Sequence, residues 1–326
     1  MKAVFVKEFG GAENLEIREV ENPPKPKGTQ VLVNVKASAL NRADILQRKG
    51  SYPAPKGYPE RILGLEFAGE VAEIGELVSN FKIDERVFGI TAGGAQAEFL
   101  LTDERLLAKI PEKLNFPKAT AVPEAFITAH DAIFTQGDLQ AGETLLVHAV
   151  GSGVGVAALQ LAKAKDIKVI GTSRTRAKLE KCRNFGLNEG ISVDSETNFA
   201  NTIKEKTGGV DVVLDLVGAK YLQANLESLN LRGRLILVGT PSGGRAELNF
   251  ALAMSKRLKI IGTVLRSRST EEKAEATKKF VEEVVPLLEE GTIRPVIDRI
   301  FAFEEIREAH ERMESNESFG KIVLEF

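Results

Sequence analysis

The chain has 326 residues, of which 43% are hydrophobic and 28% are charged, and its formal net charge is −2. The length permits two domains with separate cores, and the near balance of charge argues against a nucleic-acid-binding protein, whose basic surface would show in these totals. The single cysteine, Cys182, excludes an internal disulfide and a cysteine-built zinc site. No apolar run approaches the roughly 20 residues of a membrane-spanning helix.

The first ten residues, MKAVFVKEFG, predict a strand rather than a secretory signal, so we expect a cytoplasmic protein. Up to about residue 122 the pattern is irregular and rich in predicted strands. Alternating segments such as QVLVNVKA and GEVAEIGE are separated by the proline and glycine clusters ENPPKPKG and YPAPKGYP. Short helices are predicted over residues 43–49 and at the domain edge.

From residue 143 the chain alternates between short apolar runs and helical patterns. TLLVHAV precedes a predicted helix over 153–165, IKVIGTS precedes one over 175–185, and VDVVLDLVG precedes one over 219–229. GRLILVGT and LKIIGTVL follow. Short β-branched strands between amphipathic helices are typical of a parallel sheet covered on both faces, so this region is predicted to be an α/β domain.

After about residue 268 the pattern changes again. It predicts a long polar helix in TEEKAEATKKFVEEVVPLLEEG, a helix over 303–315 and a final strand, GKIVLEF. We expect this tail to return to the first domain, so that the β/α region is an insertion. The predicted domains are residues 1–122 plus 268–326, and residues 123–267.

The stretch AVGSGVG, residues 149–155, here called the phosphate loop, lies between a predicted strand and a predicted helix. Such a turn presents backbone N–H groups and the positive end of a helix to a diphosphate. Gly153 and Gly155 allow close approach of backbone to ligand and of helix to strand. Val150 and Ser152, however, stand where the usual loop has glycines. An ordinary strand–helix turn is the alternative, but the position at the first β/α unit favours a dinucleotide site.

The end of the next predicted strand, GTSRTRAK, discriminates between the two nicotinamide cofactors. A site for NAD usually carries an acidic residue there, which binds the ribose 2′-hydroxyl. Here Ser173, Arg174 and Lys178 offer donors and positive charge, and no carboxylate competes. Cations at a helix N-terminus are unfavourable unless an anion binds beside them. The sequence therefore predicts NADPH (NADP), with a solvated basic helix start as the alternative.

Several motifs taken together resemble the medium-chain dehydrogenase/reductase superfamily, in particular its zinc-free quinone oxidoreductase branch. They are ALNRADILQRKGSYP (39–53), LGLEFAGEV (63–71), PEAFITAH (123–130), HAVGSGVGVAALQLAKA (148–164), VDVVLDLVG, LRGRLILVG, LRSRS and GKIVL. The loop GSGVG, with IIGTVLRSRS and IDRIFAFEEIREAHERME, is similar to the p53-inducible quinone oxidoreductase subgroup. The likeness covers essentially the whole chain, and a collinear set of motifs is more specific than any single one.

The resemblance implies a Rossmann doubly wound parallel sheet inserted in a GroES-like, partly open β-barrel catalytic domain. It also implies a cofactor cleft between the domains and homodimers formed through the Rossmann sheets. It assigns Asn41, Tyr52 and Thr128 to the catalytic end of the cleft. The cofactor-binding residues that it implies are Gly151, Ser152, Gly153, Val154, Ser173, Arg174, Lys178, Gly239, Thr240, Val264, Leu265, Arg266 and Asn316.

One position departs from the pattern of the family. Many relatives carry an INY sequence whose tyrosine helps to hold the adenosine end of the cofactor. This chain has ISV, with Val193 at the tyrosine position. The departure leaves open how tightly NADPH binds, although not where it binds.

The residues also predict that the site holds no metal. Zinc-dependent relatives have cysteine at the position of Asn41 and a Gly-His-Glu sequence where this chain has Gly64-Leu65-Glu66. Leu65 cannot bind a metal, and Glu66 with Asp44 does not make a zinc site, so both carboxylates are interpreted as orienting polar groups. Without a Lewis acid to polarise a simple carbonyl, the predicted acceptor is a quinone or a conjugated enone, which delocalises the incoming charge itself.

Asn41 and Thr128 are neutral and suited to positioning an acceptor. Tyr52 is the candidate proton donor because a phenol stays protonated at neutral pH, with packing on the barrel rim as the alternative. The sequence context favours a buried, hydrogen-bonded His148, a structural or solvated His310, and a Cys182 that packs as a small hydrophobic residue.

The leading hypothesis is an NADPH:quinone oxidoreductase that acts on a small molecule, with neither a nucleic-acid nor a membrane partner. The first alternative is an NADPH-dependent enoyl or 2-alkenal reductase in which Tyr52 protonates the substrate carbon. The second alternative is an NADPH-binding protein with little turnover.

Overall fold

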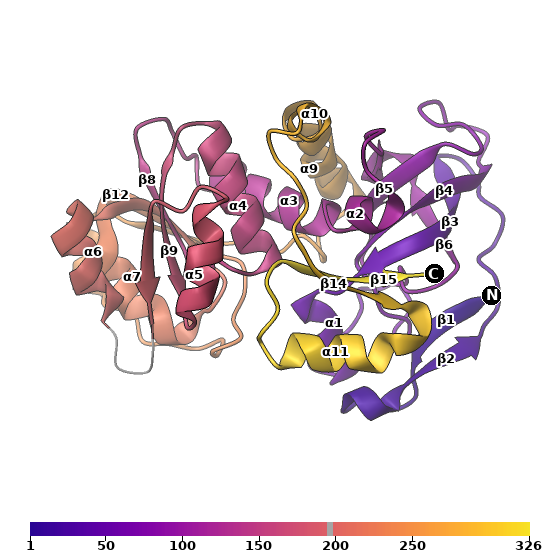
Figure 1. The fold of residues 1–326 in the computed structure, drawn as a ribbon, viewed down its shortest axis with the longest axis horizontal. Coiled ribbons are helices and arrows are strands. Elements are labelled where there is room, and N and C mark those ends of the chain that lie inside the picture. Colours follow the sequence, from indigo (N-terminus) through magenta and orange to yellow (C-terminus); the bar gives the residue numbers. More distant parts are fainter. Residues whose placement is uncertain (194–197) are drawn as a thin grey trace. The chain divides into compact units, whose positions relative to one another are not determined.

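The computed structural model describes residues 1–193 and 198–326, and the chain forms two compact units (Figure 1). Unit 1 comprises Met1–Ile127 and Leu265–Phe326, so both ends of the chain contribute to it, and unit 2 comprises Thr128–Val264. Within the described ranges, no helix has the length and the apolar character needed to cross a membrane.

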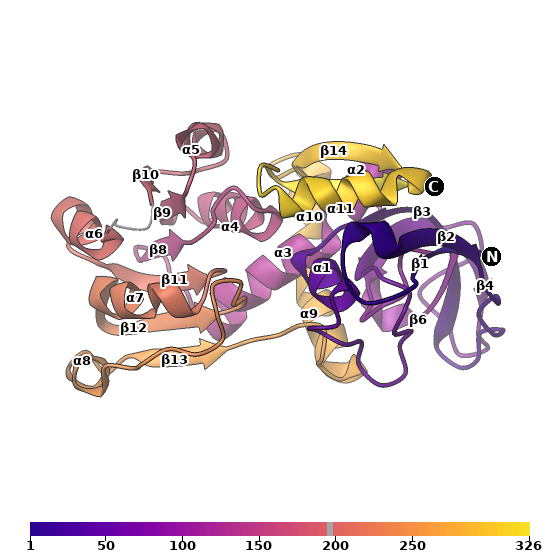
Figure 2. The same ribbon diagram turned by 90° about the horizontal axis from the view of Figure 1, so that it is seen from below.

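Unit 2 is built on a parallel sheet with the strand order β10-β9-β8-β11-β12-β13, which Figure 2 shows from one edge to the other. This is the order of a doubly wound dinucleotide-binding sheet, so the predicted fold class is confirmed. Its strands are β8 (Thr144–Val147), β9 (Lys168–Ser173), β10 (Glu189–Ser192), β11 (Val210–Asp215), β12 (Leu229–Leu237) and β13 (Lys259–Gly262).

Helices α4 and α5 pack against β8, β9 and β10, and α7 packs against β12 and α6. Apolar side chains of the strands and helices form the core of the unit, in which Leu146, Val213 and Leu235 are fully buried. The pattern analysis did not identify β10 or α6 as elements. The helices of the unit are α4 (Gly153–Ala164), α5 (Arg176–Arg183), α6 (Phe199–Thr207), α7 (Leu222–Ser228) and α8 (Phe250–Ser255).

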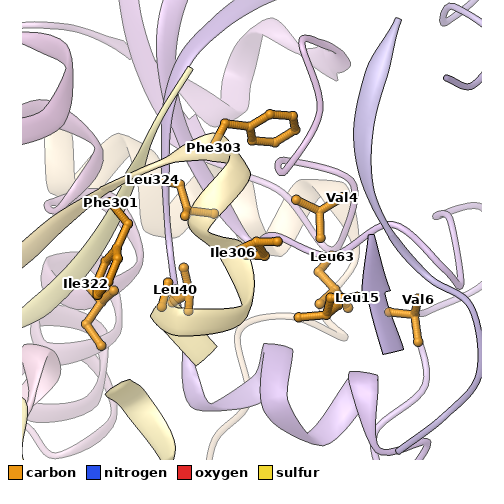
Figure 3. Packing of buried hydrophobic residues seen from close by; sticks show 11 residues of the cluster. Val4, Val6, Leu15, Leu40, Leu63, Phe301, Phe303, Ile306, Ile322 and Leu324 are labelled. Carbon is orange, nitrogen blue, oxygen red and sulfur yellow. The ribbon is translucent and has the colours of Figure 1, made fainter. Parts of the chain in front are cut away.

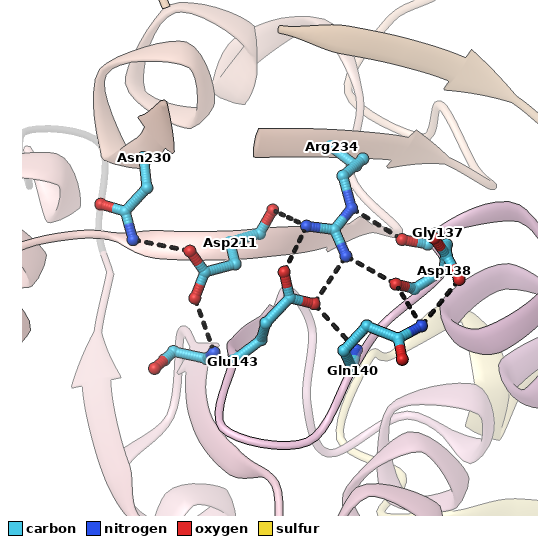
Figure 4. A network of polar contacts seen from close by, with 8 residues as sticks. Gly137, Asp138, Gln140, Glu143, Asp211, Asn230 and Arg234 are labelled. Atoms are coloured by element: carbon cyan, nitrogen blue, oxygen red, sulfur yellow. Dashed lines mark hydrogen bonds and ion pairs between the residues drawn. The ribbon is translucent and has the colours of Figure 1, made fainter. Parts of the chain in front are cut away.

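Arg234 on β12 ties the amino ends of the strands in unit 2 together (Figure 4). Its guanidinium donates to the backbone oxygens of Gly137 and Asp138 at 2.8 Å each, and it forms an ion pair with Glu143 at 2.6 Å. Asp211 on β11 accepts a hydrogen bond from the backbone N–H of Thr144 at 2.8 Å. These bonds fix the edge of the sheet that is opposite to the phosphate loop.

Unit 1 contains a hairpin of antiparallel strands β1 and β2 and a larger sheet with the order β14-β15-β3-β4-β5-β7, in which β6 also pairs with β3. The last strand of the chain, β15, runs antiparallel to β3, with Val323 opposite Ala39. The strands are β1 (Lys2–Val6), β2 (Leu15–Glu19), β3 (Gln30–Ala39), β4 (Glu66–Ile74), β5 (Arg86–Ile90), β6 (Phe99–Asp103), β7 (Leu107–Lys109), β14 (Ile297–Ala302) and β15 (Lys321–Glu325).

The predicted long helix over TEEKAEATKKFVEEVVPLLEEG is divided into α9 and α10. Pro286 near the start of α10 has no N–H and disfavours a helical conformation at the preceding residues, which explains the break. Helix α3 continues into a π-helical turn, Asp131–Gln136. The helices are α1 (Arg42–Arg48), α2 (Phe116–Thr120), α3 (Pro123–His130), α9 (Thr270–Glu283), α10 (Val285–Glu290) and α11 (Ile306–Glu314).

Residues from both ends of the chain form one core cluster of unit 1 (Figure 3). Val4 and Leu15 of the hairpin pack with Leu63, and with Ile306 of α11 and Leu324 of β15. All five side chains are almost completely buried. This apolar packing joins the C-terminal tail to the N-terminal strands.

Candidate active site

The phosphate loop leads from β8 into α4. Ser152 is the N-cap residue of α4, and its Oγ accepts a hydrogen bond from the backbone N–H of Gly155 at 3.2 Å. Ala149 adopts a left-handed φ of 47°, which turns the chain out of the strand. The first N–H groups of a helix have no partner within the helix, and they combine with the positive end of its dipole to bind anions.

Val150 is fully buried in the phosphate loop, where the usual loop has a glycine. Its side chain lies over Gly171 on β9, where an added Cβ would come within 2.8 Å of the Val150 side chain. At Gly155, an added Cβ would lie 2.6 Å from the Val150 carbonyl oxygen. Glycine at these two positions thus makes room for Val150 and lets α4 pack closely on the turn.

The segment after β9 carries positive charge at the start of α5. Ser173 is buried, and its Oγ accepts a hydrogen bond from the backbone N–H of Thr175 at 3.2 Å. Arg174 is exposed and Lys178 is partly exposed. The first turn of α5 contains no acidic residue among its described positions. The charge at this helix start is therefore positive and suits an anionic group.

The carboxyl ends of β11 and β12 carry Asp215, Gly239 and Thr240. Buried Asp215 accepts hydrogen bonds from two backbone N–H groups of the turn that follows it, at 2.7 and 2.9 Å. Thr240 packs on Gly218 of that turn, where an added Cβ would lie 2.8 Å from the Thr240 Cα. Because the strands are parallel, these residues, the phosphate loop and the segment after β9 share one edge of the sheet.

A buried polar network lies behind this edge. His148 Nδ1 is 2.8 Å from Thr172 Oγ1, and His148 Nε2 is 2.6 Å from Asn225 Oδ1. Asn225 Nδ2 donates to Asp215 at 2.9 Å. Burial lowers the pKa of His148 although the nearby Asp215 carboxylate opposes this effect. The interpretation of His148 as a buried, hydrogen-bonded residue is confirmed.

In unit 1, the amide of Asn41 is held from both sides at the start of α1. Lys321 Nζ donates to Asn41 Oδ1 at 2.7 Å, and Asn41 Nδ2 donates to Glu66 Oε1 at 2.9 Å. Lys321 and Glu66 form an ion pair at 2.6 Å, and both side chains are almost completely buried. Asp44 accepts a hydrogen bond from the Asn41 backbone N–H at 2.7 Å. These contacts fix the amide in one orientation.

Arg266 is 5% exposed and lies against Tyr52. It donates to the carbonyl oxygen of Ala92 at 2.8 Å, to that of Tyr52 at 3.3 Å, and to the side chain of Gln47. Its guanidinium carbon is 4.9 Å from the centre of the Tyr52 ring. The Tyr52 hydroxyl makes no hydrogen bond to the described residues, and burial raises its pKa, so the phenol is protonated and open to a ligand.

Asp44, Glu66 and Glu124 bring carboxyl groups to the neighbourhood of Asn41. Asp44 is fully buried, and burial raises its pKa to about 6, although hydrogen bonds from the backbone N–H groups of Asn41 and Gly64 oppose the shift. Glu124 donates its backbone N–H to Glu66 Oε2 at 2.9 Å. Burial, reinforced by the Glu66 carboxylate, raises the pKa of Glu124 to about 8. Two carboxyl groups here thus have pKa values closer to neutrality than usual.

The remaining predicted residues are more widely spread. Thr128 is partly buried in α3, and its hydroxyl has no hydrogen-bond partner in the part of the chain that the structure describes. Val264 is 46% exposed and Leu265 is buried. Asn316 lies in the turn before β15 with a left-handed φ of 59°, and its Oδ1 accepts a hydrogen bond from Arg42 at 2.8 Å.

The structure thus brings several of the predicted residues together within each unit. Asn41, Tyr52 and Arg266 gather in unit 1, whereas the phosphate loop, Ser173, Arg174, Lys178, Gly239 and Thr240 share the carboxyl edge of the sheet in unit 2. The sequence analysis missed Lys321, Glu124 and Gln47, although each stands in a quoted motif. We call the group of Asn41, Asp44, Glu66, Glu124, Arg266 and Lys321 the polar cluster.

The side chains around Asn41 do not fit a zinc ion. Leu65 is 2% exposed and offers no donor atom, and the oxygen of Asn41 accepts from the Lys321 ammonium. Among the described residues, no group of three His, Cys, Asp or Glu side chains is arranged to hold a metal ion. A lysine cation and a carboxylate therefore organise Asn41.

Other chemically reactive side chains are part of the packing. Cys182 is fully buried, and burial raises its pKa to about 12, which confirms its interpretation as a small core residue. His310 is structural: its Nδ1 lies 3.2 Å from Arg48 Nη1, and burial lowers its pKa to about 3. Val193 is 3% exposed in the core of unit 2 and presents no polar group.

Two family models match the chain, one described as an alcohol dehydrogenase GroES-like domain over residues 27–112 and one described as a zinc-binding dehydrogenase over residues 153–282. The chain is 34% identical to a quinone oxidoreductase of Homo sapiens, over 99% of this chain and 97% of that protein.

It also resembles solved structures along its length. The quinone oxidoreductase of Escherichia coli complexed with NADPH has a TM-score of 0.88 and 28% identity, with 100% of both chains covered. The JamJ enoyl reductase has a TM-score of 0.88 and 25% identity, with 99% of this chain and 98% of that chain covered.

Proposed function

Because the chain belongs to the quinone oxidoreductase family of medium-chain dehydrogenases/reductases, we propose that it reduces quinones with NADPH and without a catalytic zinc ion. The observation that carries the proposal is the environment of Asn41, whose amide is organised by the ion pair of Lys321 and Glu66. These side chains supply no Lewis acid for a simple carbonyl. An acceptor that delocalises the incoming charge itself, such as a quinone, suits this arrangement.

The phosphate loop and the segment after β9 support NADPH as the cofactor. The N-terminus of α4, capped by Ser152, suits the pyrophosphate. Arg174 and Lys178, with no acidic residue in the first turn of α5, suit the 2′-phosphate, whose charge is about −1.5 to −2. The residues proposed to contact the cofactor are those that the sequence predicts: Gly151, Ser152, Gly153, Val154, Ser173, Arg174, Lys178, Gly239, Thr240, Val264, Leu265, Arg266 and Asn316.

Three side chains are proposed to act on the acceptor. When bound, the cofactor supplies a hydride. Asn41, held in one orientation, positions the acceptor, and the hydroxyls of Thr128 and Tyr52 are free to donate hydrogen bonds to the oxygen on which negative charge develops. Arg266 holds the loop of Tyr52 in place through its contact with the carbonyl oxygen of that residue.

An NADPH-dependent enoyl reductase is the second candidate, and the state of Tyr52 is the observation that favours it. Burial raises the pKa of the Tyr52 hydroxyl, which has no internal hydrogen-bond partner among the described residues. A protonated phenol of this kind is suited to protonate the carbon of an enone or an enoyl thioester after hydride addition.

Parallel assays of NADPH consumption with phenanthrenequinone and with crotonyl-CoA test the two candidates. We expect turnover with the quinone, and Tyr52→Phe should leave it within a few-fold because no substrate carbon has to be protonated. Turnover with the thioester alone, abolished by Tyr52→Phe, would instead establish the enoyl reductase. Tight NADPH binding without turnover of any acceptor would contradict both and favour a binding protein.

We also propose that the protein is a homodimer formed through the β13 edge of the sheet in unit 2. Phe250 and Met254 on α8 are 70% and 74% exposed, and Ile260 on β13 is 38% exposed. An apolar face beside an unpaired strand edge is typical of a subunit contact. Sedimentation analysis should give a dimer, and Met254→Lys should shift it toward the monomer; a monomeric native protein would contradict the proposal.

A further inference from the structure

Glu124 is a carboxyl group of the polar cluster to which the proposed function gives no part. It lies in the first turn of α3, and its backbone N–H donates to Glu66 Oε2 at 2.9 Å. Its side chain is partly buried, and its carboxyl oxygens make no hydrogen bond or ion pair to the residues that the structure describes. An unpaired carboxyl group beside another carboxylate is unfavourable unless it carries a proton.

The cations near Glu124 have other partners. Lys321 Nζ makes three contacts, at 2.6 to 2.8 Å, with oxygen atoms of other residues. The Arg266 guanidinium donates to two backbone carbonyls and to a glutamine side chain. Lys273 on α9 donates to the carbonyl oxygen of Arg266 at 3.3 Å. None of these groups donates to Glu124.

The charges that face Glu124 come from several elements. The carboxylates of Glu66 on β4 and Asp44 on α1 oppose its ionisation, whereas Lys321 on β15 and Arg266 favour it. Burial is the largest effect and acts with the two carboxylates, so the pKa of Glu124 is raised to about 8. At neutral pH the group is therefore a carboxylic acid, which can donate a proton.

Glu124 also lies near the side chains proposed to contact the acceptor. When ionised, the Glu124 carboxylate acts to raise the pKa of Tyr52 and that of Arg266, and these two side chains are in contact with each other. Thr128 follows four residues later in α3, and residues with this spacing lie on the same side of a helix. The acid thus stands among the groups to which the proposed function assigns the acceptor.

We propose that Glu124 is the proton donor that completes quinone reduction, an inference that rests on the proposed function. The hydride brings two electrons and one proton to the quinone, which becomes the monoanion of the hydroquinone. The O–H bond of the Glu124 carboxyl group breaks and an O–H bond forms on that monoanion. The carboxylate then takes up a proton from water, so each turnover consumes one quinone, one NADPH and one solvent proton.

A purely structural role of Glu124 leads to a different expectation. A carboxylate in the first turn of a helix stabilises the helix through its dipole, and this effect requires the ionised form. Removing the charge would then lower stability and leave the pH dependence of turnover unchanged. A proton donor requires the protonated form, so the two roles differ in their response to pH.

Turnover of phenanthrenequinone over a pH series, in the native protein and in Glu124→Gln, tests the proposal. We expect the native kcat to fall above a pH of about 8, as Glu124 loses its proton. Glu124→Gln should lower kcat by about 100-fold or more and remove this fall, because the glutamine amide cannot transfer a proton to the quinone oxygen. NADPH affinity, measured by fluorescence titration, should change less than about threefold. Glu112→Gln, which removes an exposed carboxylate of the same unit, is the matched control and should behave as the native protein.

Stability measured by denaturant unfolding gives a readout that does not depend on turnover. In the folded protein the pKa of Glu124 is raised from its usual value of 4.5 to about 8, so the stabilisation it gives is fully present below pH 4.5 and is lost as the pH rises through about 8. Glu124→Gln should remove this loss between pH 5 and 8. An unchanged dependence of stability on pH in this variant would contradict a protonated Glu124.

The outcomes separate this inference from the proposed function. If the native protein does not reduce the quinone at any pH, the proposed function fails, and the role of Glu124 fails with it. If the native protein reduces the quinone and Glu124→Gln keeps both its kcat within twofold and the fall near pH 8, only the role of Glu124 is overturned. A folded Glu124→Gln variant that binds NADPH normally, but loses most of its kcat and no longer shows the fall near pH 8, supports both the proposed function and the role of Glu124.

Discussion

The phosphate loop of unit 2 and the polar cluster of unit 1 provide charge in different ways. The phosphate loop relies on backbone N–H groups at the start of α4 and on exposed Arg174 nearby. The polar cluster relies on buried side chains, such as Lys321 and Glu66, that are held at 2.6 to 2.9 Å by fixed partners. One region presents its charge to solvent, and the other keeps its charges out of water.

This difference determines how each region should respond to change. Exposed charges interact weakly with one another and are screened by salt, so each contributes little to folding and remains available to a ligand. Buried charges depend on each partner, because removing one leaves the other without compensation in a medium of low dielectric. We therefore expect substitutions in the polar cluster to affect folding, and substitutions around the phosphate loop to affect mainly binding.

The largest effect is expected from Lys321→Met. The substitution leaves Glu66, which is fully buried, without its counter-ion, and should lower the free energy of unfolding by about 3–5 kcal/mol. Lys36→Met is the control, because Lys36 and Glu70 form a pair that is partly exposed on both sides and should contribute less than about 1 kcal/mol. Denaturant unfolding measures both, and equal losses would show that burial does not distinguish the two pairs.

Gly155→Ala should have an intermediate effect. The added Cβ would lie 2.6 Å from the Val150 carbonyl oxygen, so the turn or α4 must shift, at a cost of about 1–3 kcal/mol in stability. The shift should also weaken NADPH binding, because it moves the N–H groups of the phosphate loop. At Gly244 an added Cβ meets nothing within 4 Å, so Gly244→Ala should stay within about 0.5 kcal/mol of the native protein. Thermal unfolding and NADPH titration of Gly155→Ala and Gly244→Ala measure these effects. A Gly155→Ala variant with native stability and native affinity would contradict the close packing.

Arg174→Ala should have the smallest effect on folding and a selective effect on binding. Loss of a charge-assisted contact with the 2′-phosphate should raise the Kd for NADPH by about tenfold and leave that for NADH unchanged. The effect should shrink as salt is added, because Arg174 is exposed. Lys168→Ala removes the same charge from the amino end of β9 and serves as the control. An equal loss of affinity for both cofactors would argue against a 2′-phosphate contact.

Much of the α/β pattern in unit 2 could be predicted from local sequence. TLLVHAV and VDVVLDLVG are short apolar runs that became β8 and β11, and the capping serine and glycines marked the start of α4. The four-residue strand β10 was missed because EGIS carries too short an apolar pattern. The division between α9 and α10 was also missed, although Pro286 is a local signal for it.

The phosphate loop and the polar cluster also differ in how far local sequence predicts them. The phosphate loop is one continuous stretch, so residue type and spacing are enough to predict its position and its preference for an anion. The polar cluster joins residues 41, 44, 66, 124, 266 and 321, which are distant in sequence. The sequence analysis identified Asn41 from a family resemblance and interpreted Asp44 and Glu66 as orienting groups, but no local pattern pairs Glu66 with Lys321.

The sequence by itself determined the alternation of strands and helices in unit 2, the capped turn before α4 and the basic start of α5, because these depend on neighbours within a few residues. The tertiary structure alone decided which charges are paired. Lys321 reaches Glu66 only because β15 pairs with β3, which in turn pairs with β4. The same folding places Glu124 beside that carboxylate in a partly buried setting. The protonation of such a group depends on burial and on charges from distant segments, so it becomes defined only when the chain has folded.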